Sequence, residues 1–248
     1  MKLPKIDTYD VLVEPFHVDF TGHIFLGVLG NHLLNAAGKH SQKRGWGIGA
    51  LNETQHTWVL SRLCIEMNEM PKQYEQVSIQ TWVEGVMKLF TSRNFAILRP
   101  DGTPYGYARS IWAMIDTDTR QPTDILGIHE GLIKKYIEVD KACPIAKPSR
   151  VKMGNDVQLV QTLEARYHDI DVNGHINSVK YIEHILDLWP LSWYKSHPLK
   201  RLEIAYVSEG HQGDILNFYT EAESGLERKV SVVRQGGGEL CRASMTFF

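Results

Sequence analysis

A carboxylate, an amide and an imidazole lie within five consecutive residues in the second half of the sequence, at Asp171, Asn173 and His175. These side-chain types can take a proton from water or hold a carbonyl oxygen. Apolar residues at helical spacing follow over 176–189, and Pro190 ends that pattern. The spacing therefore predicts a polar cluster at the start of a half-buried helix, where unpaired backbone N–H groups could also stabilise an oxyanion.

The same residues also have a purely structural interpretation. Asp-x-Asn-Gly is an ordinary turn sequence, and Asp or Asn ahead of a helix is an ordinary N-cap. Because short motifs match by coincidence, the cluster alone does not establish a catalytic site. Other features of the sequence are needed to distinguish a catalytic site from a turn or helix cap at these residues.

The overall composition limits the class of protein. With 43% hydrophobic and 23% charged residues in 248, the chain has the composition of a globular protein, and its net charge of −2 argues against a nucleic-acid partner. No stretch reaches the roughly 18 apolar residues that a membrane helix needs, and residues 1–7 lack the apolar core of a signal peptide. The cysteines, Cys64, Cys143 and Cys241, are too far apart for a CxxC site. We therefore expect a cytoplasmic protein without a membrane or nucleic-acid partner.

The polar motif occurs twice. Asp19-Phe20-Thr21-Gly22-His23-Ile24 matches Asp171-Val172-Asn173-Gly174-His175-Ile176, and both the aspartates and the histidines are 152 positions apart. A helical apolar pattern over 26–37 follows the first copy, as 176–189 follows the second. Self-similarity over so long a period predicts a duplicated domain.

Strand patterns extend the duplication. We expect strands at 9–16, 61–66, 76–83, 93–98 and 108–112 in the first half, and at 200–204, 214–220, 230–233 and 241–245 in the second. Pro100-Asp101-Gly102 and Gly236-Gly237-Gly238 are the expected hairpin turns. Residues 125–136 have a helical pattern, and 141–152 has the composition of a linker.

These elements predict an α+β fold with a tandem organisation. We expect one unit over 1–140, a linker over 141–152 and a second unit over 153–248, each with a long helix packed on an antiparallel sheet. Two such units can pair edge to edge as an internal pseudo-dimer, which is the arrangement of a double hotdog fold.

A family resemblance adds to this interpretation. Residues 171–182 resemble the signature of the acyl-acyl-carrier-protein thioesterases of plants and bacteria, and Thr57-Trp58-Val59-Leu60-Ser61-Arg62 resembles a second segment of that family. The resemblance extends from about residue 9 to the end of the chain. It implies a double hotdog fold and hydrolysis of fatty acyl thioesters on acyl carrier protein. By position it implies a catalytic set of Asp171, Asn173, His175 and Glu209.

One position departs from the family pattern. Many plant members carry a cysteine directly after the glutamate, whereas this chain has Gly210. A cysteine nucleophile is therefore excluded at that position, and a serine-hydrolase GxSxG motif is absent from the sequence. No HExxH or Cys/His cluster occurs either, so no metal or other cofactor is expected. Direct attack by water is favoured, and without a plastid transit sequence a bacterial form is expected.

The sequence does not assign an individual role to each of the four candidate catalytic residues. Either Glu209 or His175 could polarise the water, and Asn173 could orient the substrate carbonyl or the water. Asp171 is either a second base or the residue that shapes the turn.

The first half of the duplication lacks part of this set. It has Thr21 in place of Asn173, and Met70 or Pro71 near the position of Glu209. We therefore expect one working site, in the second unit, and an acyl-chain pocket in the first. The candidates for that pocket are Trp46, Trp58, Leu29 and Leu33.

The expected partner, acyl carrier protein, is acidic, so a basic patch should surround the site. Lys180 and Arg201 are the candidates for docking it, and the chain could be a monomer or a homodimer. Two other functions remain open. A hotdog enoyl-thioester hydratase or dehydratase would not need Glu209, and a non-enzymatic acyl-binding module would not need the polar cluster.

Overall fold

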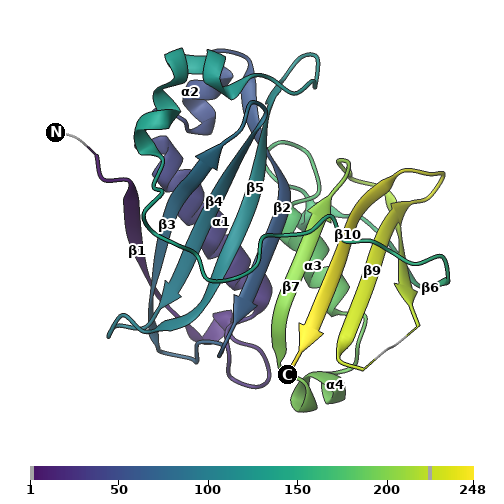
Figure 1. Ribbon diagram of the computed structural model, residues 1–248. Coiled ribbons are helices and arrows are strands. Elements are labelled where there is room, and N and C mark those ends of the chain that lie inside the picture. The colour runs from purple at the N-terminus through teal and green to yellow at the C-terminus, as the bar shows by residue number, and fades with distance from the viewer. Residues whose placement is uncertain (1–2, 223–224) are drawn as a thin grey trace. The chain divides into compact units, whose positions relative to one another are not determined.

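The computed structural model describes residues 3–222 and 225–248. The chain divides into two compact units, each of which combines helices with an antiparallel sheet (Figure 1). The first unit comprises residues up to Leu63 together with Asn68–Lys147, and the second comprises Cys64–Met67 together with Pro148–Phe248. The fold class is therefore α+β, as the sequence predicts.

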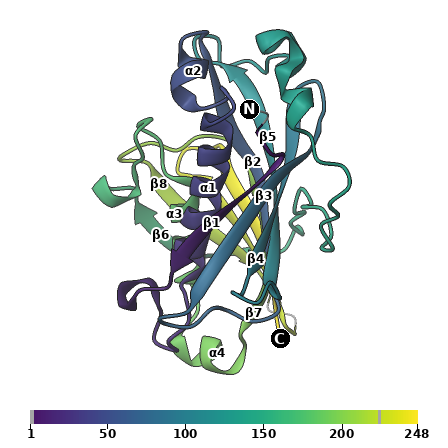
Figure 2. The ribbon, with the colours of Figure 1, turned by 90° about the vertical axis from the view of Figure 1, so that its left-hand side faces the viewer.

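The described residues of the first unit form five strands, and its long helix lies along the sheet (Figure 2). The strands have the order β1-β3-β4-β5-β2, and β3 is antiparallel to both β1 and β4. In chain order the elements are β1 (Ile6–Leu12), α1 (Leu26–Gln42), α2 (Ile48–Asn52), β2 (His56–Met67), β3 (Gln76–Val86), β4 (Phe90–Leu98), β5 (Pro104–Asp116) and a 3-10 segment, η2 (Ile125–Tyr136), with a shorter 3-10 turn at Pro15–His17.

The second unit repeats this topology. Its strand order is β6-β8-β9-β10-β7, which is the order of the first unit with each strand replaced by the one five places later. This identity confirms the duplication that the two motifs predict, and each unit is a hotdog unit. The elements are β6 (Val157–Glu164), a 3-10 turn (Tyr167–Asp169), α3 (Ser178–Leu186), α4 (Leu191–Ser196), β7 (Leu199–Tyr206), β8 (Ile215–Glu221), β9 (Glu227–Arg234) and β10 (Glu239–Phe247).

The helices bury the faces that their apolar spacing predicts. On α1 the buried side chains include Leu29, Leu33 and Ala36, and the helix packs against β1 and β3. On α3 they include Val179 and Ile182, and the helix is joined to β7 by a 2.8 Å hydrogen bond from the Tyr206 hydroxyl to the Ser178 carbonyl oxygen. Burial of these stripes is the main contribution to helix stability, because α3 is too short to be stable alone.

Both predicted hairpin turns are present. In the first unit the Gly102 N–H donates to the Arg99 carbonyl oxygen at 2.9 Å, and Gly102 has a φ of +85°. In the second, Gly236–Gly238 all have positive φ, which a side chain would disfavour, and the Gly237 N–H donates to the Arg234 carbonyl oxygen at 3.0 Å. Each turn joins the last two strands of its unit.

Two predicted elements differ from the structure. The strand expected over 9–16 begins at Ile6 and ends at Leu12, since Pro15 starts a 3-10 turn and cannot donate a ladder hydrogen bond. The helix expected over 125–136 is a 3-10 segment broken between Ile128 and Gly131, where His129 and Glu130 have φ of +46° and +53°. Apolar spacing alone does not detect such a break.

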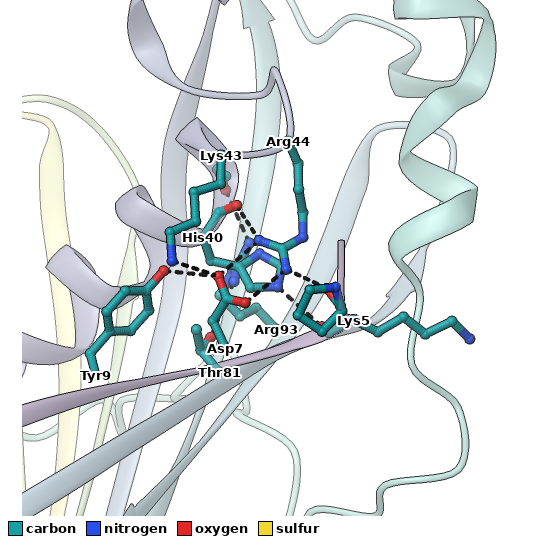
Figure 3. A network of polar contacts seen from close by, with 10 residues as sticks. Lys5, Asp7, Tyr9, His40, Lys43, Arg44, Thr81 and Arg93 are labelled. Atoms are coloured by element: carbon teal, nitrogen blue, oxygen red, sulfur yellow. Dashed lines mark hydrogen bonds and ion pairs between the residues drawn. The ribbon is translucent and has the colours of Figure 1, made fainter. Parts of the chain in front are cut away.

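A buried ion pair joins β1 to the end of α1 (Figure 3). Both carboxylate oxygens of Asp7 accept hydrogen bonds from the Arg44 guanidinium at 3.0 Å, and the Tyr9 hydroxyl donates a third bond at 3.0 Å. Burial by itself would raise the pKa of Asp7, but the hydrogen bonds from Arg44 and Tyr9 outweigh it and lower the pKa to about 2. Asp7 therefore stabilises the fold only while it is ionised.

We expect acid to weaken the fold through Asp7. Its pKa is lowered from 3.8 to about 2, so its contribution is present above pH 4 and is lost as the pH falls toward 2. The shift corresponds to about 2 kcal/mol of unfolding free energy. Urea titrations at pH 6 and near pH 2 should show a loss that is larger by about this amount in the wild type than in Asp7→Asn. An equal loss in both proteins would show that another group carries the acid sensitivity.

Candidate functional site

The turn that carries the second motif is held together by Asp171. One oxygen of its carboxylate accepts hydrogen bonds from the backbone N–H groups of Asn173, at 2.8 Å, and His175, at 3.3 Å. Its backbone N–H donates to the His175 carbonyl oxygen at 2.8 Å, and its own carbonyl oxygen accepts from Gly174 at 3.0 Å. Asp171 therefore shapes the turn, which is one of the two roles, turn residue or second base, that the sequence leaves open for it.

The residue that caps the helix is a different one. The side-chain oxygen of Asn177 accepts a 2.8 Å hydrogen bond from the Val179 N–H, which makes Asn177 the N-cap of α3. The interpretation of Asp171 or Asn173 as the helix cap is therefore wrong. Asn173 is exposed and lies in the turn that precedes the helix.

The structure brings His175 and Glu209 together. His175 Nε2 lies 3.4 Å from Glu209 Oε2, and both side chains are partly exposed, at 25% and 34%. Their approach depends on backbone pairing, because the Ile176 N–H donates to the Gly210 carbonyl oxygen at 2.8 Å and His175 forms an antiparallel bridge with His211. The two residues are 34 positions apart in sequence, yet they are close enough to share a proton or to contact the same water molecule.

Two further residues surround this pair, and sequence reasoning did not select them. The ring of His211 packs edge-on against the His175 ring at a centroid distance of 5.1 Å. The Arg234 guanidinium donates to the Glu209 carbonyl oxygen and forms a 3.0 Å ion pair with Asp214. His211 lies two residues after Glu209, and that short spacing was the available signal. Arg234 gave no sequence signal, because it reaches the site from the end of β9.

The first unit has the same turn with different side chains. The Asp19 carboxylate accepts hydrogen bonds from the Thr21 N–H at 2.7 Å and from its hydroxyl at 2.6 Å. The Thr21 hydroxyl oxygen in turn lies 2.9 Å from His23 Nδ1. The imidazole is thus bonded within its own turn.

Backbone pairing also identifies the residue that stands where Glu209 does. The Ile24 N–H donates to the Pro71 carbonyl oxygen at 2.8 Å, and His23 forms a bridge with Lys72. Pro71 therefore corresponds to Gly210, and Met70 corresponds to Glu209. Of the two residues that the sequence proposes for this position, the structure selects Met70, which has no ionisable group.

Close packing explains the glycine next to Glu209. A Cβ atom on Gly210 would lie 2.5 Å from the Tyr181 hydroxyl oxygen and 2.6 Å from Ile176 Cδ1. These distances are shorter than real Cβ contacts, so even alanine would require the neighbours to move. The departure from the family cysteine therefore agrees with the packing of α3 against this loop.

The first unit contains a cavity of about 660 Å³. Trp46 and Trp58, two of the four predicted pocket residues, line it, and their rings are 6.2 Å apart. Leu29 and Leu33 are buried in the helix–sheet core and are not among the residues that line this cavity, whereas their neighbour Leu34 is. Helical spacing identified the buried face of α1 but could not tell core from cavity wall.

The two docking candidates already have carboxylate partners. Lys180 Nζ lies 2.6 Å from Glu183 on the next turn of α3. The Arg201 guanidinium is ion-paired with Glu66 and, at 2.6 Å, with Glu203. An acidic partner would have to compete with these contacts.

The described residues show neither a metal-binding cluster nor a membrane-spanning helix. Within 3–222 and 225–248, no group of three His, Cys, Asp or Glu side chains is arranged to hold a metal ion. No helix in the same part of the chain has the length and apolar character required to cross a membrane.

Comparisons with known families agree with the two-unit architecture. The acyl-ACP thioesterase N-terminal domain matches residues 6–136, and the acyl-ACP thioesterase C-terminal domain matches residues 153–248. A chloroplastic palmitoyl-acyl carrier protein thioesterase of Gossypium hirsutum is 28% identical over 82% of this chain and 52% of its own length. A chloroplastic dodecanoyl-[acyl-carrier-protein] hydrolase of Cinnamomum camphora is 27% identical over 86% of this chain and 60% of its own length. The chain spans about half the length of the curated relatives it matches.

Two solved structures are similar over nearly the whole chain. An acyl-ACP thioesterase from Bacteroides thetaiotaomicron is 52% identical, with a TM-score of 0.91 and coverage of 98% of both chains. A 12:0-ACP thioesterase from Umbellularia californica is 20% identical, with a TM-score of 0.84 over 99% of this chain and 98% of its own. The second similarity shows that the fold is shared.

The packing around Gly210 predicts a cost for any side chain there. We expect Gly210→Ala to lower the free energy of unfolding by about 1–3 kcal/mol, because the added methyl group overpacks a closed site. Gly154→Ala is the matched control, since its Cβ would meet nothing closer than 3.5 Å. Urea denaturation of both variants tests this, and equal stabilities would show that the loop relaxes freely.

Proposed function

The chain belongs to the acyl-acyl-carrier-protein thioesterase family, and from this premise we propose that it hydrolyses fatty acyl thioesters on acyl carrier protein to free fatty acid and carrier protein. The observation that carries the proposal is the 3.4 Å approach of His175 Nε2 to Glu209 Oε2 in the second unit. A base of this kind next to an open turn is what hydrolysis by water requires.

The proposed reaction uses water as the nucleophile. Glu209 or His175 takes one proton as the water oxygen attacks the thioester carbonyl carbon, and the carbonyl oxygen becomes an oxyanion. Asn173, on the exposed turn beside His175, is proposed to orient the carbonyl or the water. The tetrahedral intermediate then expels the thiolate, which receives the proton from the base, so that free acid and the carrier thiol remain. Asp171 supports this by holding the turn, with its role as a second base left to experiment.

We propose that the two units have different functions. The second unit, 153–248, carries the catalytic set, while the first, 1–140, holds the acyl chain, and 141–152 links them. Support comes from Met70, which replaces the carboxylate in the first unit, and from the cavity beside Trp46 and Trp58. Trp46 and Trp58 are the better-supported acyl contacts, since Leu29 and Leu33 lie in the core.

Acyl carrier protein is the proposed partner, and the cytoplasm is the proposed compartment. Three separate buried thiols are typical of a reducing environment. Docking through Lys180 and Arg201 remains a prediction, and so does the choice between monomer and homodimer.

A panel of acyl thioesters tests the function. The protein is incubated with acyl carrier protein and coenzyme A thioesters of several chain lengths, and free thiol and free fatty acid are measured together. Equal release of both from the carrier protein substrates is expected. Loss of an enoyl substrate without thiol release would favour the hydratase alternative, and binding without any turnover would favour an acyl-binding module.

The two copies of the motif should respond differently to mutation. We expect His175→Ala and Glu209→Gln each to lower kcat by about 10² to 10⁴-fold, which is typical for loss of a general acid–base group. His23→Ala should change stability or KM instead, because its imidazole is bonded to Thr21 and faces no carboxylate equivalent to Glu209. Measurements of kcat, KM and Tm on the three variants test this.

The matched histidines separate catalysis from turn structure. If both motifs were only turns, the two His→Ala variants would lose Tm alike and keep kcat. If His23→Ala were as inactive as His175→Ala while still folded, the single-site proposal would have to be abandoned.

The cysteines should play no part in turnover. All three are buried, and burial raises the pKa values of the Cys143 and Cys241 thiols, so few thiolates are available to react. We expect iodoacetamide treatment of the native protein, followed by removal of the reagent, to leave kcat within about twofold of the untreated value. This margin corresponds to the small effects that are usual for changes at a protein surface. Loss of activity that parallels alkylation of one thiol in the folded protein would contradict attack by water.

A further inference from the structure

The cavity of the first unit contains a buried cation whose protein partners are neutral. Arg93, on β4, is 6% exposed and lines the cavity. Its guanidinium donates to the Thr81 hydroxyl at 3.1 Å and to the Ser41 hydroxyl at 3.0 Å. Within residues 3–222 and 225–248, no acidic side chain is ion-paired with it.

The charges around Arg93 do not balance. Four basic side chains line the cavity, Lys39, Lys43, Arg44 and Arg93, and no described acidic side chain does. The carboxylate labelled in Figure 3 is that of Asp7, and both of its oxygens already accept hydrogen bonds from Arg44. Burial and the neighbouring Arg44 lower the pKa of Arg93 to about 10, which still leaves it charged at neutral pH.

An uncompensated buried cation is costly, because desolvation is not offset by a counter-ion. Methionine or leucine would fill the same volume without that cost. Arg93 therefore marks a position where an anionic oxygen from outside the protein would be strongly favoured, since charge-assisted hydrogen bonds are the strongest of their kind.

The remainder of the cavity is suited to hydrocarbon. The rings of Trp46, Trp58 and Trp112 line it together with Val83 and Ile133. Its volume of about 660 Å³ is within the range of small-molecule sites.

We propose that this cavity binds the free carboxylate of a fatty acid, with the carboxylate on the Arg93 guanidinium and the hydrocarbon against the three indole rings. A thioester-bound acyl chain cannot supply this anion, because it would enter with its methyl end. The binding proposal rests on the cavity alone. Its consequence, that the released acid competes with the acyl chain of the substrate and raises KM without lowering kcat, rests on the proposed function.

The test compares an acid with its uncharged ester. Decanoate and methyl decanoate are titrated into the wild-type protein and into Arg93→Met, with tryptophan fluorescence as the readout, because three tryptophans line the cavity. We expect Arg93→Met to weaken decanoate binding on the order of tenfold to hundredfold, as for loss of a charged hydrogen bond, and to leave the ester unchanged. Arg99→Met is the matched control, since Arg99 pairs with Glu69 and does not line the cavity.

Three results would overturn the proposal: equal affinity of the wild type for acid and ester, unchanged decanoate binding in Arg93→Met, or an equal loss in Arg99→Met. Arg93→Met should keep or raise Tm, because it removes an unpaired buried charge. If that variant failed to fold, the acid–ester comparison in the wild type would still decide. The titrations need no turnover, so they succeed or fail independently of the hydrolysis assay.

Discussion

The arrangement of the second unit depends on one short stretch of backbone pairing. The Ile176 N–H bonds to the Gly210 carbonyl oxygen, and His175 bridges His211, so the loop after β7 is held against the motif turn. This pairing sets the distance between the His175 and Glu209 side chains. It also brings Gly210 so close to Tyr181 and Ile176 that a side chain there would force these neighbours to move. The approach of His175 to Glu209 and the crowding at Gly210 therefore have a common cause in the same backbone contact.

Both units contain that backbone contact, and they differ in the side chain that lies next to it. The Ile24 N–H bonds to the Pro71 carbonyl oxygen in the first unit, yet the adjacent residue is Met70. The scaffold was therefore retained after duplication while the side chains diverged. The first unit therefore presents no carboxylate at the position of Glu209, and it contains a cavity lined by tryptophan and arginine.

Two buried arginines of the first unit, Arg44 and Arg93, lie in different electrostatic environments. Arg44 is paired with Asp7 through two hydrogen bonds, so its burial is compensated and β1 is tied to the end of α1. Among the residues that the structure describes, Arg93 is held by two hydroxyl groups, which orient the guanidinium without neutralising it. The first arrangement contributes to stability, whereas the second leaves charge available for a ligand. Two arginines in one cluster thus have separate physical roles.

Local sequence determined the repeat, the elements and the motif. The apolar helical spacing and the glycine turns act through neighbouring residues, and the two motif copies can be matched letter by letter, so all three can be recognised without a structure. The tertiary structure decided which distant groups meet. The approach of His175 to Glu209, the equivalence of Met70 to Glu209 and the crowding around Gly210 all arise from backbone contacts between segments far apart in sequence. Periodicity likewise shows that Leu29 and Leu33 are buried, but only packing shows that they lie in the core, whereas Trp46 lines a cavity and Arg93 lies beside it. The reason is that the buried face of one helix can be read from its own residues, whereas a cavity forms where the side chains of several elements do not fill the space between them.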